Sequence, residues 1–296
     1  MAITVKLMHP LFVGEVQDVD LSQPMSDETF AEIQKAIDDN AVLVFHGPKL
    51  DEDQQATFAE RFGPLYDDNR IIKTGSKQRI GPKLVDISNI NENNETMERD
   101  DRRRIFGLAN QLWHTDASFK KVTAKYSLLH AHTVVPEGGE TQYTDMRAAY
   151  DALPQKTKDL IEDLEAEHCI ATSREKLGFS NFSEEERKAL PPVHHGLVRV
   201  NPANGRKALY LASHASHIVG WPVPEGRMLI RDLMEHATQP QFVHTHHWQV
   251  GDLVIWDNRA TMHRARPFDL DQYKRDMRRA TVMDPDYMES AAQKSA

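Results

Sequence analysis

Apolar positions recur along the chain at two spacings, which separate predicted helices from predicted strands. Where they repeat at about 3.6 residues, one face of a helix is apolar and the other polar. Ser26 precedes the first such segment and is a preferred helix N-cap, and Gly63 follows the second as a helix stop. In chain order, the predicted helices cover residues 26–39, 51–62, 146–153, 154–165 and 224–237.

Short runs rich in β-branched and aromatic residues, bounded by glycine, proline or asparagine, predict strands. Between residues 3 and 21, apolar and polar groups alternate as expected for early strands. Further along, the predicted strands cover residues 41–45, 84–87, 126–132, 140–143, 193–200, 208–211, 242–248, 253–256 and 279–283.

Three polar stretches interrupt these elements, at residues 66–82, 89–108 and 173–192. Long insertions in compact domains often serve as lids or binding loops. Many short strands with interspersed helices, and no internal repeat, favour a single domain over residues 1–296. We expect it to be mainly β with flanking helices (α+β) on a barrel or jelly-roll core. Regular strand–helix alternation, typical of a doubly wound sheet, is missing.

Composition is ordinary for a globular protein, with 40% hydrophobic and 27% charged residues. A formal net charge of −9 argues against nucleic acid as a partner, because no basic surface is evident that would neutralise phosphates. The basic run at residues 102–104 directly follows Asp100 and Asp101. We interpret this region as a solvated loop of mixed charge.

Cys169 is the only cysteine, which excludes disulfides within the chain and all-cysteine zinc sites and fits a reducing compartment. No segment approaches 18 consecutive apolar residues, and the first ten residues contain no run of signal-peptide length. We therefore expect a cytoplasmic protein without membrane association.

Residues 110–118, Asn-Gln-Leu-Trp-His-Thr-Asp-Ala-Ser, hold the first candidate for chemistry. His114 and Asp116 stand two apart, so an extended backbone would present both side chains on one face. Such a pair can occupy two positions on a divalent metal. A distant histidine would complete the two-His-one-carboxylate set that leaves Fe(II) open to oxygen chemistry. The His-x-Asp pattern alone occurs by chance in many proteins.

His263 is the candidate third ligand, because it closely follows the abrupt polar cluster at residues 257–259. His244 and His246 compete with it, since they alternate onto one strand face and could bind zinc. For that pair we favour a histidine-rich, exposed strand face.

Arg275 and Arg279 lie 12 and 16 residues beyond His263. They stack on a helix or flank a bend into the strand predicted near residue 280. A guanidinium grips a carboxylate through two parallel hydrogen bonds. Two such groups near a metal would suit a cosubstrate whose carboxylate is remote from its metal-chelating end.

These motifs, in this order, resemble those of the Fe(II)/2-oxoglutarate dioxygenases of the taurine dioxygenase group. The likeness covers most of the chain and is greatest for members that oxidise aryloxyacetates. The matching segments are residues 62–65, 86–89, 113–116, 138–141, 145–154, 225–229 and 256–259, together with His263, Arg275 and Arg279.

The resemblance implies a double-stranded β-helix (jelly-roll or cupin-like) core with His114, Asp116 and His263 as the iron ligands. It also implies that 2-oxoglutarate chelates the metal through its keto acid end. Thr141 and Arg275 would hold the distal carboxylate of that cosubstrate.

For the organic substrate, the resemblance places Arg279 against its carboxylate or sulfonate. Lys73, in the loop after Phe-Gly-Pro-Leu, and the backbone amide of Ala117 would assist, and His214 would line the pocket. His214 could equally be a packed histidine.

The implied reaction hydroxylates the carbon next to the ether oxygen of an aryloxyacetate such as 2,4-dichlorophenoxyacetate. The product would yield a phenol and glyoxylate, while 2-oxoglutarate and O2 give succinate and CO2. Ascorbate is expected to support activity, and a homo-oligomer is possible. Three alternatives stand beside this reading: a taurine or alkylsulfonate dioxygenase, a non-catalytic jelly-roll binder, and a zinc hydrolase that works without O2.

Overall fold

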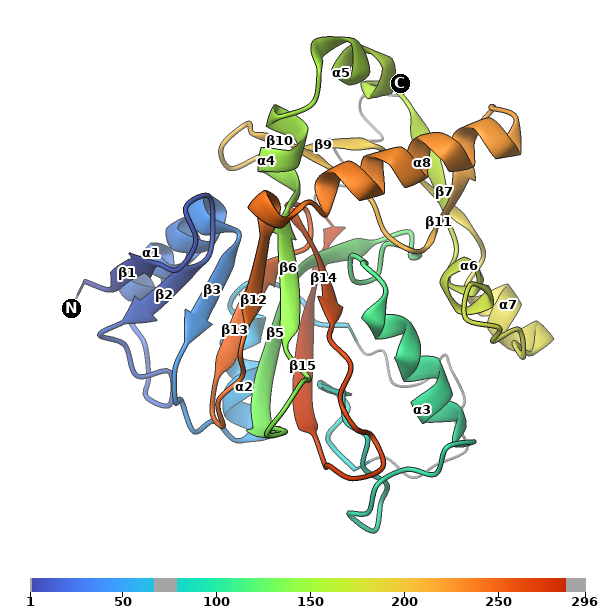
Figure 1. Cartoon of the computed structure of the whole chain (residues 1–296). Coiled ribbons are helices and arrows are strands. Elements are labelled where there is room, and N and C mark those ends of the chain that lie inside the picture. Colours follow the sequence, from blue (N-terminus) through green and yellow to red (C-terminus); the bar gives the residue numbers. More distant parts are fainter. Residues whose placement is uncertain (1, 67–78, 286–296) are drawn as a thin grey trace.

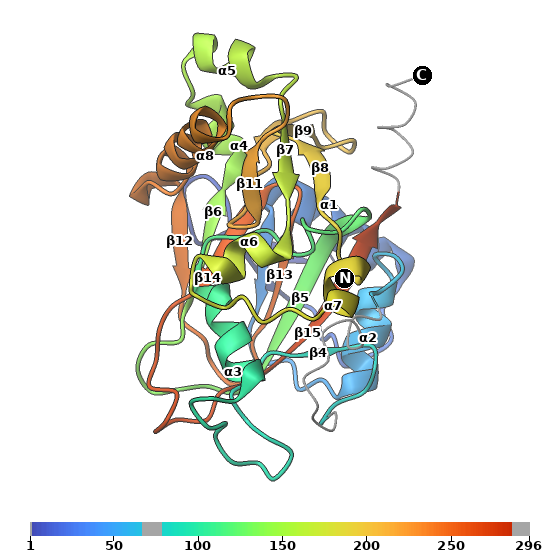
Figure 2. The same ribbon diagram turned by 90° about the vertical axis from the view of Figure 1, so that its right-hand side faces the viewer.

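Two facing β-sheets form the centre of the molecule, and helices pack on the outer side of the larger sheet (Figures 1 and 2). The computed structural model describes residues 2–66 and 79–285. The large sheet has the order β1 (Thr4–Leu7), β2 (Gly14–Gln17), β3 (Val42–Phe45), β13 (Leu253–Asp257), β5 (Thr123–Thr133), β15 (Asp276–Asp284) and β4 (Val85–Asp86).

The small facing sheet has the order β12 (Val243–His246), β6 (Thr141–Asp145) and β14 (Thr261–Ala265). Two further antiparallel sheets are β11 (Ala215–Ile218), β7 (Glu165–His168) and β8 (Val193–Gly196), and β10 (Lys207–Leu209) with β9 (Val198–Val200). Among the paired strands of the described chain, β2 and β3 alone run parallel.

The helices are α1 (Asp27–Asn40), α2 (Glu52–Glu60), α3 (Arg102–Gly107), α4 (Met146–Asp151), α5 (Gln155–Ile161), α6 (Ile170–Glu175), α7 (Glu184–Ala189) and α8 (Val223–Ala237). Two 3-10 turns are η1 (Leu108–Gln111) and η2 (Pro240–Phe242).

Side chains from both central sheets meet in one buried layer. Tyr143 of β6 packs against Trp256 of β13, with ring centroids 5.6 Å apart, in a cluster with Val44 and Leu129 of the large sheet. Two apposed sheets filled by alternate inward side chains are the arrangement of a jelly roll. The structure thus confirms the mainly β jelly-roll core with flanking helices.

Helix α1 begins at the N-cap that the sequence predicted, and α2 begins at a second side-chain cap. The Ser26 side chain accepts a hydrogen bond from Thr29 N–H at the start of α1, and Asp51 forms a capping box with Gln54 at the start of α2. The helices α1 and α2 contribute their apolar faces, including fully buried Ile37, to the core on the outer side of the large sheet. Truncating such an isoleucine to alanine would cost about 2–5 kcal/mol.

The polar stretches contain more structure than predicted. Residues 102–107 form α3 inside the stretch expected to be a loop, and residues 184–189 form α7. Both helices are short, and both are stabilised by side-chain caps rather than by an apolar stripe, at Asp101 and Ser183. Most of the stretch at 66–82 lies outside the described residues.

Three other expectations need correction. The helix predicted to reach residue 165 ends at Ile161, and Glu165 already begins strand β7, in which more and less buried positions alternate. The strands β12 and β13, expected as partners across a turn, pair in different sheets. The basic run 102–104 is not a solvated loop, since its side chains form ion pairs with Glu186, Asp101 and Asp271.

Within residues 2–66 and 79–285, no helix has the length and apolarity needed to cross a bilayer.

Candidate active site

The two strand segments that carry the predicted metal ligands are hydrogen-bonded to each other. His114 N–H donates to the His263 carbonyl at 3.0 Å, and His263 N–H donates back to the His114 carbonyl at 2.8 Å. This antiparallel bridge sets the two imidazoles beside each other, with ring centroids 4.2 Å apart. Asp116 follows on the same face, while Thr115 points away and donates to Leu211. The extended geometry inferred from the His-x-Asp spacing is present.

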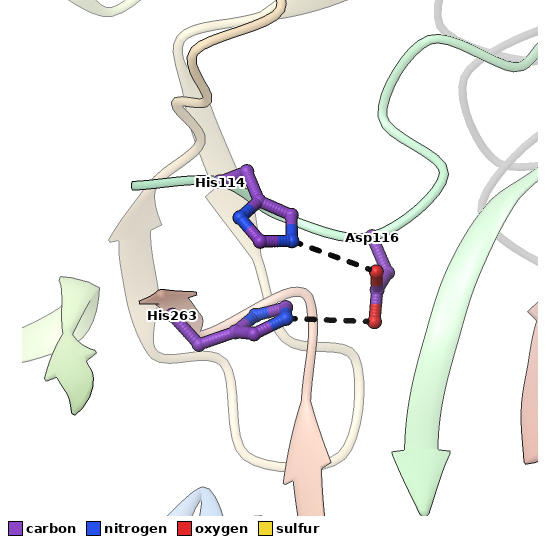
Figure 3. A group of neighbouring side chains, drawn as sticks. All are labelled: His114, Asp116 and His263. Atoms are coloured by element: carbon purple, nitrogen blue, oxygen red, sulfur yellow. Dashed lines mark ion pairs between the residues drawn. The ribbon is translucent and has the colours of Figure 1, made fainter. Parts of the chain in front are cut away.

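All three side chains point toward one spot (Figure 3). The distance from His114 Nε2 to Asp116 Oδ1 is 3.9 Å, and from His263 Nε2 to Asp116 Oδ2 it is 3.8 Å. One ligand atom from each residue lies within 4.8 Å of the others, and all three residues are buried. Among the described residues, no other group of three such side chains meets this criterion. Two imidazoles and a carboxylate are the donor set of the non-haem iron facial triad.

The protonation states of the three side chains suit metal binding. Nδ1 of His114 lies 2.8 Å from the Leu112 carbonyl, which can only accept, so Nδ1 holds the proton and the lone pair is on Nε2. Burial lowers the pKa of His114 and, more strongly, that of His263, which keeps both rings neutral. Burial alone would raise the pKa of Asp116, but the charge of Arg279 and the hydrogen bond from Ser127 keep the pKa of this carboxyl below its usual range. Neutral imidazoles and an ionised carboxylate are the forms that bind metals.

Asp116 is held by the polar cluster that follows β13. The Asn258 side-chain carbonyl accepts hydrogen bonds from Asp116 N–H and Trp256 Nε1–H, each 3.1 Å long. Its amide donates to Ser127 Oγ at 2.9 Å, and the Ser127 hydroxyl donates to Asp116 Oδ2 at 2.8 Å. Every polar atom in this chain of bonds is satisfied, so the carboxylate has one defined orientation.

The sequence left two arrangements open for Arg275 and Arg279, stacking on a helix or flanking a bend into a strand, and the structure shows the strand. Arg275 directly precedes β15 and Arg279 lies within it, so no helix stacks them. The Arg279 Nη1 donates to Asp116 Oδ1 at 2.6 Å. Arg275 is buried, and burial lowers its pKa to about 10, so it stays charged at neutral pH. The Asn89 side chain accepts from Arg275 N–H at 2.8 Å and fixes the start of the strand.

The Gly138-Gly139 turn lets the chain approach Arg275 closely. Both glycines have positive φ, and a Cβ on Gly138 would lie 2.4 Å from the Pro267 carbonyl oxygen. Arg275 Nη2 donates to the Gly139 carbonyl at 3.2 Å. Thr141 begins β6 just after this turn, and its hydroxyl accepts a hydrogen bond from Trp248 Nε1–H at 3.0 Å. The turn therefore positions Thr141 and Arg275 at the same end of the site.

A cavity of about 690 Å³ opens onto the ligand trio and contains Thr141, Arg275 and Arg279 in its wall. Among the described residues, seven arginines and one lysine line it, against two aspartates, although the whole chain carries a net charge of −9. Apolar side chains fill the intervals, namely Ile80, Val85, Ile87, Met97, Phe106, Leu108, Phe119, Leu129, Ile170, Leu190, Phe268 and Leu270. A mainly apolar cavity with convergent cations favours an organic anion as its ligand.

The remaining predicted substrate residues are distributed as follows. Ala117 lines the cavity in a left-handed conformation (φ 52°), which turns the chain sharply after Asp116. His214 is buried in the same wall, its ring 4.9 Å from Phe119 and its Nδ1 3.0 Å from Ser173 Oγ. Lys73 lies outside the described residues.

The competing histidines have other roles. His246 Nε2 lies 3.0 Å from Asp252 Oδ2, and His244 packs against the Phe12 ring. The prediction of an exposed strand face is wrong here, because His246 is buried and His244 is half-buried. Neither belongs to the group of candidate metal ligands found among the described residues.

Arg174 is a buried cation of the cavity wall that the sequence did not reveal. Arg174 of α6 is buried in the cavity wall, with its guanidinium carbon 4.0 Å from the centroid of the Phe106 ring. Arg174 falls in the polar stretch at residues 173–192, which the sequence predicts as a long insertion. The apolar ring that covers it comes from α3. No local pattern around Arg174 signals that contact.

Comparisons with known proteins agree with this geometry. A family model described as taurine catabolism dioxygenase TauD, TfdA family, matches residues 4–281. The chain is 45% identical over 284 residues to the alpha-ketoglutarate-dependent 2,4-dichlorophenoxyacetate dioxygenase of Cupriavidus pinatubonensis, covering 96% of this chain and 99% of that protein. It is 34% identical over 256 residues to the (S)-phenoxypropionate/alpha-ketoglutarate-dioxygenase of Delftia acidovorans, with 83% of each covered.

Among solved structures, the crystal structure of AAD-2 in complex with Mn(II) and N-oxalylglycine matches with a TM-score of 0.89 and 46% identity. The match covers 96% of this chain and 98% of that one. The fold, the ligand trio and the 45% identity over nearly the full length all point to the same family. The chain belongs to the TauD/TfdA family and is a 2-oxoglutarate (alpha-ketoglutarate)-dependent dioxygenase with a His-Asp-His metal site.

Proposed function

We propose that this enzyme uses Fe(II), 2-oxoglutarate and O2 to hydroxylate the carbon between the ether oxygen and the carboxylate of an aryloxyacetate. 2,4-Dichlorophenoxyacetate is the first candidate. The observation that carries the proposal is the 45% identity, over nearly both full lengths, to a dioxygenase named for that substrate. The cavity supports it, because cationic and apolar side chains line it side by side.

His114, Asp116 and His263 would hold the iron. Bound there, Fe(II) would supply the oxidative decarboxylation of 2-oxoglutarate to succinate and CO2 that is coupled to hydroxylation. The protein's own part is to keep the two imidazoles neutral, orient the carboxylate through Ser127 and Asn258, and surround the reaction with apolar side chains.

Thr141 and Arg275 would hold the distal carboxylate of 2-oxoglutarate. Arg275 is buried and remains charged at neutral pH, and its Nη2 donates a hydrogen bond to the Gly139 carbonyl. The Thr141 hydroxyl accepts from Trp248 and can donate its own proton to a carboxylate oxygen. This pair would define how far the cosubstrate extends from the metal.

Arg279 would face the carboxylate of the organic acid. Its Nη1 is engaged by Asp116, but its buried Nε finds no partner in the described part of the chain. The Nε–Nη2 edge of a guanidinium can bind both oxygens of a carboxylate. Ala117 N–H, His214 and Lys73 would complete the substrate pocket.

The organic acid would thus present its ether-side C–H to the oxidising centre while its aryl ring lies among the apolar side chains. Hydroxylation there gives a hemiacetal, which collapses to a phenol and glyoxylate. We include in this proposal a cytoplasmic location, support of activity by ascorbate, and possible homo-oligomers.

A substrate panel tests the proposal. Succinate formation would be measured with Fe(II), ascorbate and 2-oxoglutarate against aryloxyacetates, 2-aryloxypropionates, cinnamates and sulfonates. We expect an aryloxyacetate to give the highest kcat/KM, with one phenol released per succinate. Preferential sulfite release from taurine would assign a sulfonate dioxygenase instead, and turnover that persists without O2 would point to a hydrolase.

A further inference from the structure

Arg174 is a buried cation without a carboxylate partner among the described residues. Its Nη1 donates to Ser173 Oγ at 2.9 Å, and its plane lies over the Phe106 ring. The buried Nε has no hydrogen-bond partner in that part of the chain. Two other arginines of the cavity wall, Arg79 and Arg103, each pair with aspartates. Leaving such a buried donor unsatisfied destabilises the protein, because the donor has lost its hydrogen bonds to water.

The open side of Arg174 suits one kind of ligand. With Nη1 taken by Ser173 and one face covered by Phe106, the Nε–Nη2 edge remains available. That edge donates two parallel hydrogen bonds, which match the two oxygens of a carboxylate. A neutral ligand group would satisfy the hydrogen bonds without compensating the buried charge.

Arg174 and Arg279 line the same cavity. The pKa of Arg174 is lowered to about 9, mainly by burial and further by the charge of Arg279. Neither guanidinium has a partner for its Nε in the described part of the chain, and the two repel each other, so an anion that lies between them stabilises both.

Ser173 links this cation to a second residue of the wall. Its Oγ contacts both Arg174 Nη1 (2.9 Å) and His214 Nδ1 (3.0 Å), and its hydroxyl donates to the Ile170 carbonyl. With that proton directed to the carbonyl, both other contacts must donate to Oγ, so His214 holds its proton on Nδ1. Arg174 and His214 are thereby fixed as one hydrogen-bonded unit.

We propose that Arg174 is a substrate-binding residue that holds the carboxylate of the organic acid through its Nε–Nη2 edge, opposite Arg279. The inference rests on the proposed function for the identity of the acid. It adds a second guanidinium to the recognition of that acid, on the helical side of the cavity.

The test compares an acid with its neutral amide. Binding of phenoxyacetate and phenoxyacetamide to the full chain, loaded with Mn(II) and 2-oxoglutarate under nitrogen, would be measured by titration calorimetry. We expect Arg174→Gln to weaken phenoxyacetate roughly 10- to 100-fold, the loss of one charge-assisted contact, and phenoxyacetamide less than about threefold. Arg174→Lys, which keeps the charge but loses the two-donor edge, should give an intermediate loss for the acid.

Arg102→Gln is the matched control. Arg102 also lies over a ring of the same helical wall, Phe179, but pairs with Glu186 and does not line the cavity. We expect this variant to retain the wild-type preference for acid over amide.

Two results would overturn the inference: equal weakening of acid and amide by Arg174→Gln, which indicates a structural role, or unchanged affinity for the acid. If Arg174→Gln does not fold, wild-type affinity of Arg174→Lys for the acid would count against it equally. A failure of the proposed function is recognised separately. In that case wild-type enzyme binds no aryloxyacetate, and the same comparison is made with the acid that the panel identifies.

Discussion

The metal side and the helical side of the cavity are built in different ways. On the metal side, β5, β6, β14 and β15 place their side chains through continuous backbone pairing, and the carboxylate of Asp116 is compensated by Arg279. On the helical side, α3, α6 and α7 are each six residues long and meet through side chains alone. Rings of Phe106, Phe179 and Phe182 pack there within 6.3 Å of one another.

This difference separates two tasks. A metal centre needs ligand atoms fixed to within a few tenths of an ångström, which a hydrogen-bonded sheet provides. A substrate wall must admit and release an organic molecule, and short helices joined by rings and ion pairs open at lower cost than a sheet. The charges differ as well, because Arg279 on the metal side pairs with Asp116, whereas Arg174 on the helical side has no carboxylate partner among the described residues.

The largest expected effect comes from removing a ligand. His263→Ala should abolish succinate formation and also the rise in Tm that Mn(II) produces in wild-type protein, since a ligand that binds only the folded state stabilises it. Calorimetry with and without Mn(II) measures this without relying on turnover. His247→Ala is the control, because His247 is an exposed histidine of the same small-sheet region. A full Mn(II) response in His263→Ala would remove His263 from the metal site.

The next largest effect concerns Asn258, which orients Asp116 without being a ligand. Asn258→Ala removes the acceptor for Asp116 N–H and the donor to Ser127 Oγ. Loss of such outer contacts lowers metal affinity roughly 10- to 100-fold. Competition with a chelator of known affinity would measure the change. Unaltered affinity would mean that the sheet alone holds the carboxylate and that this hydrogen-bonded chain contributes little.

On the metal side, Arg279 and Arg275 are expected to bind different substrates, and this difference can be tested. Arg279→Ala should raise KM for the organic acid about 10-fold or more with a smaller change for 2-oxoglutarate, since a charge-assisted contact contributes about 1.5–3 kcal/mol. Arg275→Gln should show the reverse pattern. Steady-state kinetics with each substrate varied in turn distinguishes the two. Equal effects on both KM values in both variants would show that the roles are misassigned.

The fold could be predicted where local pattern and tertiary position agree. The helices α1, α2 and α8 carry either an N-cap or an apolar stripe long enough to show periodicity, and strands such as β13 are short apolar runs. Helices α3 and α7 span less than two turns, too short for a stripe to be evident. Their stability depends on caps and on ion pairs between segments far apart in the chain, which no local window contains.

The same distinction between local pattern and long-range contact decides which residues of the site could be predicted. His114, Asp116 and His263 were identified because ligand spacing on strands is a local pattern and the family motifs are ordered along the chain. Arg174 has neither property. Its sequence neighbourhood is polar, and its burial arises from Phe106 on α3. A charged residue that acquires its role through a long-range contact is indistinguishable from a surface residue until the chain is folded.

The smallest expected effect tests how the helical side is held. Arg102 of α3 donates two hydrogen bonds to Glu186 of α7, at 2.9 and 2.8 Å, and Glu186 is buried. Arg102→Gln, Glu186→Gln and the double variant form a cycle whose coupling should be about 1.5–3 kcal/mol, the range for charged hydrogen bonds. The predicted readout is faster hydrogen exchange in α3 and α7, with the Mn(II) affinity unchanged because the ligand strands form none of these contacts. Loss of metal affinity together with the faster exchange would show that the two sides of the cavity form one cooperative unit, and the separation of their tasks would then be wrong.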